Sequence, residues 1–342
     1  MSVKFIKETD FNDFVGKMME ARTVVGPVAK KTKFVFGELE SVDQLRLDYD
    51  VTILPPKKLF FPPRQDLLKF HGQKGTSCIC PQPKVLFGVH YYDIKAIDQT
   101  DFLFNENNAD QNYLANREAT TIIGTTIQNV SPRAFFGSVG KNVNPKGHDG
   151  FLTRINGGWV FETLTSKGRD LLDFGKFIDA DDAQKAEAAK VNTEEKTKSP
   201  EKIKAEGDVV AQKVRKSFSE DELWEEFAKD CFSCGSCNIV CPTCYCFDVQ
   251  DNWNVDQHSG ARTRSWDGCL KADFAECSLG QGACENFRET KGSRFRHRIM
   301  RKAVYSNEKL GGPACVGCGR CSLSCTADIA DPVNVINRIV EG

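Results

Sequence analysis

The first apolar pattern along the chain has the period of a helix. Phe11, Phe14, Val15 and Met18 are three or four residues apart within the stretch 7–20. Positions at this spacing lie on one face of a helix. We therefore expect a short amphipathic helix with a structural role near the start of the chain.

Shorter apolar runs after this helix have the pattern of strands. Asn156-Gly157 between alternating apolar residues is typical of a tight hairpin turn. The runs 85–89 and 120–124 predict buried strands. Further strands are expected at 23–28, 33–36, 151–155 and 159–164. Residues 1–175 are therefore predicted to form a mixed α/β domain.

Two stretches interrupt these patterns. The prolines at 55, 56, 62 and 63 exclude regular helix and predict an extended, loop-like crossing. Within residues 176–230, the stretch from 178 to about 215 is rich in Ala, Lys, Glu and Asp, and Ser199-Pro200 divides it into two helical parts. We interpret this stretch as an exposed, charged helical linker. Its last helix is expected to be capped by Ser219 and to lead into Cys231.

Two cysteine runs near the C-terminal end carry the clearest chemistry. Each has three cysteines with two residues between neighbours and a fourth after three more residues, which is a [4Fe-4S] signature. The fourth cysteine of such a run ligates the other cluster. We therefore expect one cluster on Cys231, Cys234, Cys237 and Cys325, and a second on Cys315, Cys318, Cys321 and Cys241. Glycines at 235, 317 and 319 allow close approach of the backbone.

Two other uses of cysteine compete with the clusters. A zinc ribbon needs only four thiolates in paired knuckles and does not explain four cysteines in each run. Disulfides are typical of secreted chains, whereas the N-terminus here has no apolar leader, so we expect a cytoplasmic protein. No apolar run is long enough to span a membrane.

The remaining cysteines give no recognisable ligand pattern. Cys78 and Cys80 form a pair without visible partners. Cys244, Cys246, Cys269, Cys277 and Cys284 are irregularly spaced, and cysteine is often simply a small buried residue. A third metal site on these thiols is left open.

The segment 242–314 between the two runs is long for a minimal ferredoxin. Its second half predicts a helix over 293–305, with Phe295, Ile299 and Val304 as an apolar stripe. The same helix is strongly basic through Arg294, Arg296, Arg298, Arg301 and Lys302. We interpret these residues as a solvated or partner-contacting face near the clusters, whose cations would raise the reduction potentials. The predicted fold is thus α+β and multidomain, with a mainly helical, ferredoxin-like bis-[4Fe-4S] domain at 231–342.

Several sequence motifs resemble those of one iron-sulfur family, which includes the A subunit of anaerobic sulfite reductase together with the beta subunit of sulfhydrogenase. These motifs are CFSCGSCNIVCPTCYCFDVQD, TRSWDGC, ENFRET and CVGCGRCSLSC, together with LFFPPRQDLLKF, VLFGVHYYDIKAID and YLANREATTIIG in the first half. The resemblance implies an electron-transfer subunit between a catalytic partner and a subunit that binds flavin and nicotinamide. That catalytic partner would be a hydrogenase, a heterodisulfide-reductase-like protein or a sulfite reductase.

The chain departs from this family in its first domain. Family members typically carry a further [4Fe-4S] cluster there, but the corresponding places, 90–93 and 126–132, contain no cysteine. His90 alone is more typical of a structural histidine than of a ligand. We therefore expect two clusters, and a first domain that has kept its fold and lost its cluster.

The sequence offers no substrate machinery. No glycine-rich nucleotide motif follows a strand, and no catalytic residue is assigned. Lys plus Arg number 46 against 47 Asp plus Glu, so no overall charge favours nucleic acid. The leading hypothesis is an electron relay. The alternative is a stand-alone iron-sulfur oxidoreductase with a cofactor or substrate pocket in the first domain.

Overall fold

The computed structural model describes residues 2–139 and 146–342, and these form two compact units. The first unit comprises the described residues within 1–61, 80–131 and 140–200, and the second those within 62–79, 132–139 and 201–342. The two units alternate along the sequence, because an early segment, 64–77, pairs with later strands of the second unit. The division into 1–175, 176–230 and 231–342 stays a prediction, and its boundaries differ from those of the two units.

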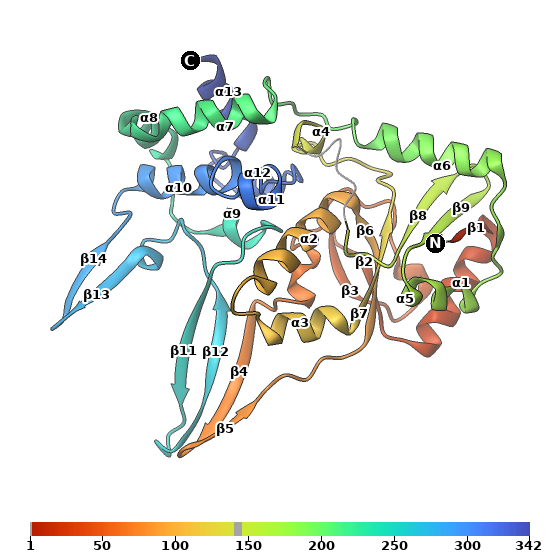
Figure 1. Ribbon diagram of the computed structural model, residues 1–342, viewed down its shortest axis with the longest axis horizontal. Coiled ribbons are helices and arrows are strands. Elements are labelled where there is room, and N and C mark those ends of the chain that lie inside the picture. The colour runs from red at the N-terminus through yellow and green to blue at the C-terminus, as the bar shows by residue number, and fades with distance from the viewer. Residues whose placement is uncertain (1, 140–145) are drawn as a thin grey trace. The chain divides into compact units, whose positions relative to one another are not determined.

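The first unit is built on one eight-stranded sheet with the order β10-β1-β9-β8-β7-β6-β2-β3 (Figure 1). The pairs β2/β6, β6/β7 and β7/β8 are parallel, and the outer pairs are antiparallel. The strands are β1 Ser2–Lys7, β2 Val24–Lys30, β3 Lys33–Glu38, β6 Lys84–His90, β7 Thr120–Thr125, β8 Gly150–Ile155, β9 Gly158–Thr163 and β10 Ile178–Asp179.

Helices cover both faces of this sheet. The helix α1 (Glu8–Ala21) packs against one face, where Phe11 stacks on Trp159 with 4.9 Å between ring centroids. The helix α6 (Asp182–Glu195) packs on the other face, where Ala188 joins Val160 in a second core. The remaining helices of this unit are α2 Tyr91–Asn105, α3 Gln111–Glu118 and α5 Ser166–Asp170.

Most elements predicted for the first half are confirmed. Every residue of β7 and all but the first residue of β6 are buried. The strands β8 and β9 meet at Asn156-Gly157, and Gly157 has a φ of +80°, which explains the glycine of the turn. The predicted extended crossing at 55–63 is partly wrong, because Pro56–Leu59 forms a short 3-10 helix.

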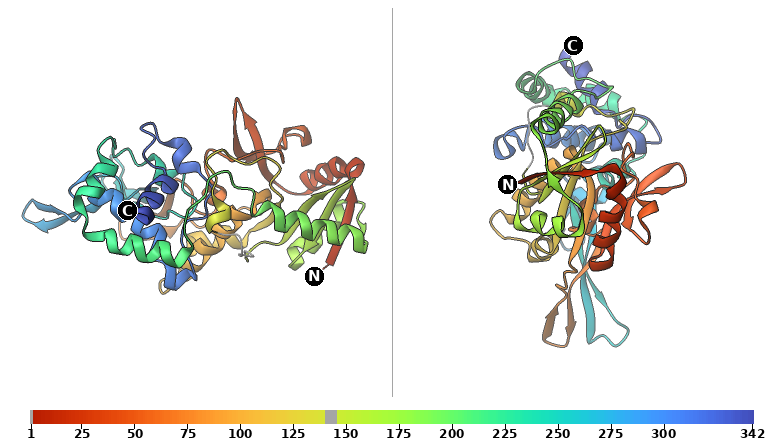
Figure 2. Two further views of the ribbon diagram at one scale, coloured as in Figure 1. Left: turned by 90° about the horizontal axis from the view of Figure 1, so that it is seen from above. Right: turned by 90° about the vertical axis from the view of Figure 1, so that its right-hand side faces the viewer.

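The second unit contains strands as well as helices, so its predicted mainly helical character is not confirmed. One sheet has the order β11-β12-β4-β5, and a separate hairpin projects from the helices of this unit (Figure 2). The residues of β11 are all exposed, and such a strand leaves no apolar pattern to recognise. The strands are β4 Arg64–His71, β5 Lys74–Ser77, β11 Phe247–Trp253, β12 Ser259–Trp266, β13 Glu276–Gly280 and β14 Ala283–Asn286.

The helices of the second unit share one apolar core. Val214, Trp224, Phe295 and Ile336 meet there, each from a different helix. The helices are α4 Phe136–Val139, α7 Gly207–Lys216, α8 Asp221–Ala228, α9 Ser236–Ile239, α10 Lys291–Ala303, α11 Asn307–Leu310, α12 Arg320–Ser324 and α13 Pro332–Glu341. None of the helices in the described part of the chain combines the length and apolar character needed to span a membrane.

Two predictions for 176–230 need correction. The segment holds the helices α6, α7 and α8, but α7 is not an exposed spacer, because Val210 and Val214 are buried in the core of the second unit. Most side chains of α7 are polar or charged, so the composition of the segment did not indicate that Val210 and Val214 would be buried. Ser219 does not cap α8 either, since the N-cap residue is Glu220 and no side chain caps this end. The helix is held instead through Trp224, whose Nε1 donates to the Ser217 carbonyl at 2.7 Å.

Candidate functional site

The first cysteine run follows α8 and turns tightly on itself. Gly235 has a φ of +72°, a conformation that favours glycine, and leads into the short helix α9. The backbone amide of Ser233 donates to Cys231 Sγ at 3.4 Å, and the thiol of Cys234 lies 3.4 Å from Ser236 Oγ. The loop thus directs polar hydrogens toward sulfur, the kind of contact that tunes iron-sulfur clusters.

The second run forms a similar loop before α12. Gly317 has a φ of +69°, and its amide lies 3.5 Å from Cys315 Sγ. A Cβ at Gly317 would lie 2.5 Å from the backbone of Phe136, so the segment 132–139 packs directly on this loop. The amide of Phe135 also donates to the Gly317 carbonyl at 2.8 Å. Glycine is required here for both backbone conformation and space.

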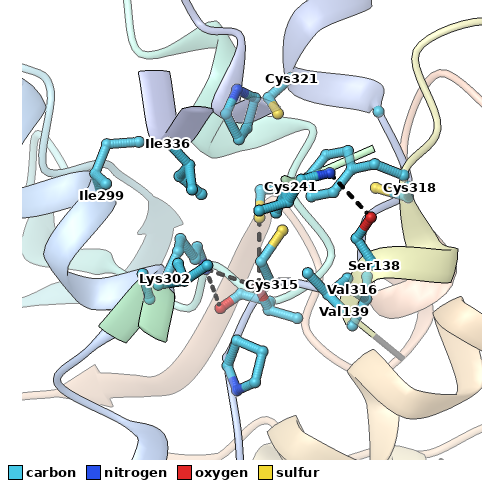
Figure 3. Close-up of a pocket in the computed structure, with 18 of the residues that line it drawn as sticks. Ser138, Val139, Cys241, Ile299, Lys302, Cys315, Val316, Cys318, Cys321 and Ile336 are labelled. Carbon is cyan, nitrogen blue, oxygen red and sulfur yellow. Dashed lines mark hydrogen bonds between the residues drawn. The ribbon is translucent and has the colours of Figure 1, made fainter. Parts of the chain in front are cut away.

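The cysteines of the two runs line two cavities, and each cavity draws on both runs. Cys231, Cys234 and Cys237 share a space of about 380 Å³ with Cys325. Cys315, Cys318 and Cys321 share a larger one, about 830 Å³ and partly open to solvent, with Cys241. Figure 3 shows the labelled cysteines of the larger cavity around one space, with Lys302 nearby. These two linings coincide with the two ligand sets predicted from the spacing.

The residues around these cavities fit a four-iron cluster. Within the described residues, no three His, Cys, Asp or Glu side chains converge on the position of a single metal ion. In a [4Fe-4S] cluster each thiolate binds a different iron, so the four sulfurs stand apart around a common space. The larger cavity is walled mainly by apolar residues, among them Phe135, Ile203 and Val316, which would shield a cluster from water.

The basic helix α10 corrects the prediction of a solvated face. Arg294 and Arg298 are only 5% and 2% exposed. Arg294 donates to the carbonyls of Arg288 and Glu289 at 2.9 and 2.6 Å. Arg296 behaves as expected of a surface residue, since it pairs with Asp221. Positions 294 and 298 lie one helical turn apart beside the apolar stripe, and this spacing could have indicated that the two arginines are buried.

Two cations of α10 border the larger cavity. Arg298 and Lys302 both line it, one helical turn apart. Arg298 Nη2 lies 3.4 Å from the carbonyl oxygen of Cys237. Lys302 Nζ donates to the carbonyl and hydroxyl oxygens of Thr243, at 3.0 and 2.7 Å. Lys302 therefore fixes the loop that presents Cys241.

The pKa values of the cysteines reflect burial opposed by these cations. Burial raises the pKa of Cys237 to about 12 and that of Cys315 to about 11. A hydrogen bond with Cys244 holds the pKa of Cys241 well below its usual value, and the charges of Lys302 and Arg298 act in the same direction. Iron binds the thiolate form, so these cations favour the state that can act as a ligand.

The other cysteines stand in different surroundings. Cys244 and Cys269 both lie near the side-chain amide of the buried Asn238, with Nδ2 to Sγ distances of 3.7 and 3.4 Å. Cys277 pairs with Glu285 and Cys284 with Ser278 across the hairpin β13–β14. Cys246 is half-buried before β11, and Cys78 and Cys80 follow β5. Whether these thiols bind a further metal stays open.

His90 lies in the core of the first unit. Its ring stacks on Tyr49 with 3.9 Å between centroids and an interplanar angle of 1°. Its Nδ1 lies 2.9 Å from the hydroxyl of Tyr92. These contacts support the interpretation of His90 as a structural residue.

Comparison with known proteins places this site in a family. Residues 230–329 match the model of the 4Fe-4S dicluster domain, which confirms two [4Fe-4S] clusters as cofactors. The chain is 33% identical over 332 residues to sulfhydrogenase 2 subunit beta of Pyrococcus furiosus, covering 97% of this chain and 96% of that protein. No solved structure gives a significant match. The chain belongs to the iron-sulfur family that includes the beta subunit of sulfhydrogenase together with the A subunit of anaerobic sulfite reductase.

Proposed function

We propose that this chain is the electron-transfer subunit of a cytoplasmic, anaerobic oxidoreductase complex. Its relative in Pyrococcus furiosus is a subunit of a sulfhydrogenase, and its own second unit carries a dicluster domain. Each cluster, when bound, takes up and gives back one electron. One proposed neighbour is a subunit that binds flavin and nicotinamide. The other is a catalytic subunit, either a hydrogenase, a heterodisulfide-reductase-like protein or a sulfite reductase.

The observation that carries the proposal is the exchange of one cysteine between the two cavities. Cys325 of the second run lines the cavity of the first, and Cys241 of the first run lines the cavity of the second. This is the arrangement of ferredoxins with two clusters, in which electrons pass between neighbouring cubanes. We therefore assign Cys231, Cys234, Cys237 and Cys325 to one cluster, and Cys315, Cys318, Cys321 and Cys241 to the other.

The first unit is proposed to serve as a docking platform. It contains a large covered sheet, while His90–Asp93 and Thr126–Pro132 supply no thiol. The imidazole of His90 is committed to Tyr49 and Tyr92. A cluster in this unit is not part of the proposed electron path.

Serine substitutions test the ligand sets through iron content. Cys237→Ser should remove the first cluster and Cys321→Ser the second, each leaving about four of about eight irons per chain. Cys277→Ser, on the strand β13 and outside both linings, is the matched control and should keep all the iron. Full iron content in both ligand variants would reject the assignment.

The relay itself is tested in the native assembly. Cys237→Ser and Cys321→Ser should each stop electron flow through the complex and leave assembly with the other subunits intact. Co-purification of those subunits shows that assembly has survived. The isolated chain should show iron-sulfur absorbance and no bound flavin. Turnover by the isolated chain with bound flavin would instead support a stand-alone oxidoreductase.

A further inference from the structure

Arg298 is a buried cation with few conventional partners. It is 2% exposed and lies at the middle of α10. Its Nη2 approaches the Cys237 carbonyl at 3.4 Å, and its Nε has no hydrogen-bond acceptor among the described residues. No carboxylate of the described chain forms an ion pair with it. Burying a charged group is energetically unfavourable unless an opposite charge lies nearby. The positive charge of Arg298 must therefore be balanced by a group other than a carboxylate.

The groups that face Arg298 belong to both cluster cavities. Its Nη2 contacts the backbone oxygen of Cys237, a residue that lines the smaller cavity. Arg298 itself lines the larger cavity, together with Cys241, Cys315 and Cys321. Burial lowers the pKa of the guanidinium, but the negative charge of Cys237, Cys321 and Cys241 in their thiolate form outweighs it and raises the pKa. Arg298 therefore lines the larger cavity and at the same time contacts a residue that lines the smaller one.

We propose that Arg298 is a shared counter-cation that raises the reduction potentials of both clusters. The proposal rests on the ligand sets of the proposed function. Reduction adds one electron to a cluster and makes it more negative, and a fixed positive charge nearby stabilises the reduced form more than the oxidised one. Because Arg298 is buried, solvent screens this interaction weakly.

The neighbouring cations of α10 differ from Arg298 in a useful way. Lys302 lines the larger cavity as Arg298 does, but its hydrogen bonds go to Thr243 and not to a cysteine of the smaller cavity. Arg296 lies on the same helix, but its charge is paired with Asp221 and its guanidinium lies over the ring of Phe218. Removal of Arg298 should therefore affect both clusters, removal of Lys302 mainly the second, and removal of Arg296 neither.

The test is a redox titration of the full-length, anaerobically purified protein, followed by electron paramagnetic resonance of both clusters. In Arg298→Gln and Arg298→Met, each cluster's one-electron reduction should be at least tenfold less favourable, which corresponds to about 59 mV per cluster. Arg298→Lys keeps the positive charge, so its two cluster potentials should stay close to those of the unsubstituted protein. Arg296→Gln makes the same change in net charge and should leave both potentials unchanged.

The outcomes separate this proposal from the one on which it rests. If the neutral variants of Arg298 keep full iron and either cluster keeps its potential, the shared role is overturned. If both neutral variants lose iron while Arg298→Lys retains it, Arg298 is a structural cation and the proposal is also overturned. An error in the ligand sets would appear elsewhere, as full iron content in Cys237→Ser and Cys321→Ser.

Discussion

Lys302 donates from its Nζ to both the carbonyl and the hydroxyl oxygen of Thr243, and so ties α10 to the loop that carries Cys241. Lys302→Met should loosen this loop, because two hydrogen bonds from a charged donor are lost, at a cost of about 3 kcal/mol in unfolding free energy. The second cluster should then be lost to a chelator faster than the first. Iron release followed by absorbance checks this, and equal release rates for both clusters would contradict it.

Gly317 and Gly311 form a natural pair of test positions. Both have positive φ, +69° and +65°, but only Gly317 lies against another backbone, 2.5 Å from Phe136 for an added Cβ. Gly311→Ala should cost about 1 kcal/mol for its backbone conformation alone. Gly317→Ala should cost at least about 3 kcal/mol, because the segment 132–139 has to move. Chemical denaturation measures both, and similar values for the two variants would contradict the close packing.

Glu195 gives the first unit a distinct pH dependence. Burial raises the pKa of its carboxyl to about 7, although the Ile127 amide donates to it at 2.7 Å and Lys196 and Lys198 lie nearby. Its folded pKa exceeds its unfolded value, so its contribution is fully present below about pH 4.5 and is lost as the pH rises through about 7. The folded state binds the additional proton in this window.

The comparison of Glu195 with Glu195→Gln isolates that contribution. The difference in unfolding free energy between the two proteins should change by up to about 3 kcal/mol from pH 4.5 to 8, in favour of the variant at high pH. Glutamine still offers an oxygen that can accept from the Ile127 amide, so the two proteins differ mainly in the ability of residue 195 to ionise. A difference that does not vary with pH would show that Glu195 ionises normally.

His90 should be dispensable for iron and important for stability. His90→Ala removes the stacking on Tyr49 and the contact with Tyr92, and leaves a cavity in a fully buried place. The expected cost is about 3 kcal/mol in unfolding free energy, with unchanged iron per chain. Loss of iron with little loss of stability would identify His90 as a ligand instead.

The sequence indicated the apolar elements well and the polar ones poorly. The strand β6 and the hairpin β8–β9 followed directly from apolar runs and from Asn156-Gly157. The exposed strand β11 had no such pattern, and its partner β12 pairs in turn with β4, from a distant part of the chain. Pairing between such remote segments depends on tertiary contacts that local patterns do not contain.

The candidate site shows the same contrast. The spacing of the cysteines predicted two ligand sets, and the same two groups of four cysteines line the two cavities, while their binding to clusters stays a prediction. The burial of Arg298 was not predicted, since a charged residue is usually exposed unless it has a partner. Arg298 contacts the Cys237 carbonyl of the first run and lines a cavity with Cys315 and Cys321 of the second, and only the folded chain shows these groups together.

The exchange of Cys241 and Cys325 between the cavities also has a consequence for biosynthesis. With the proposed ligand sets, the set that includes Cys241 is complete only once residue 321 has been synthesised, and the other set only once residue 325 has, although the first run is made about ninety residues earlier. Stable insertion of iron and sulfide would therefore have to wait until the second run has been synthesised. A nascent chain that stalls before this point would expose unprotected thiols to oxygen.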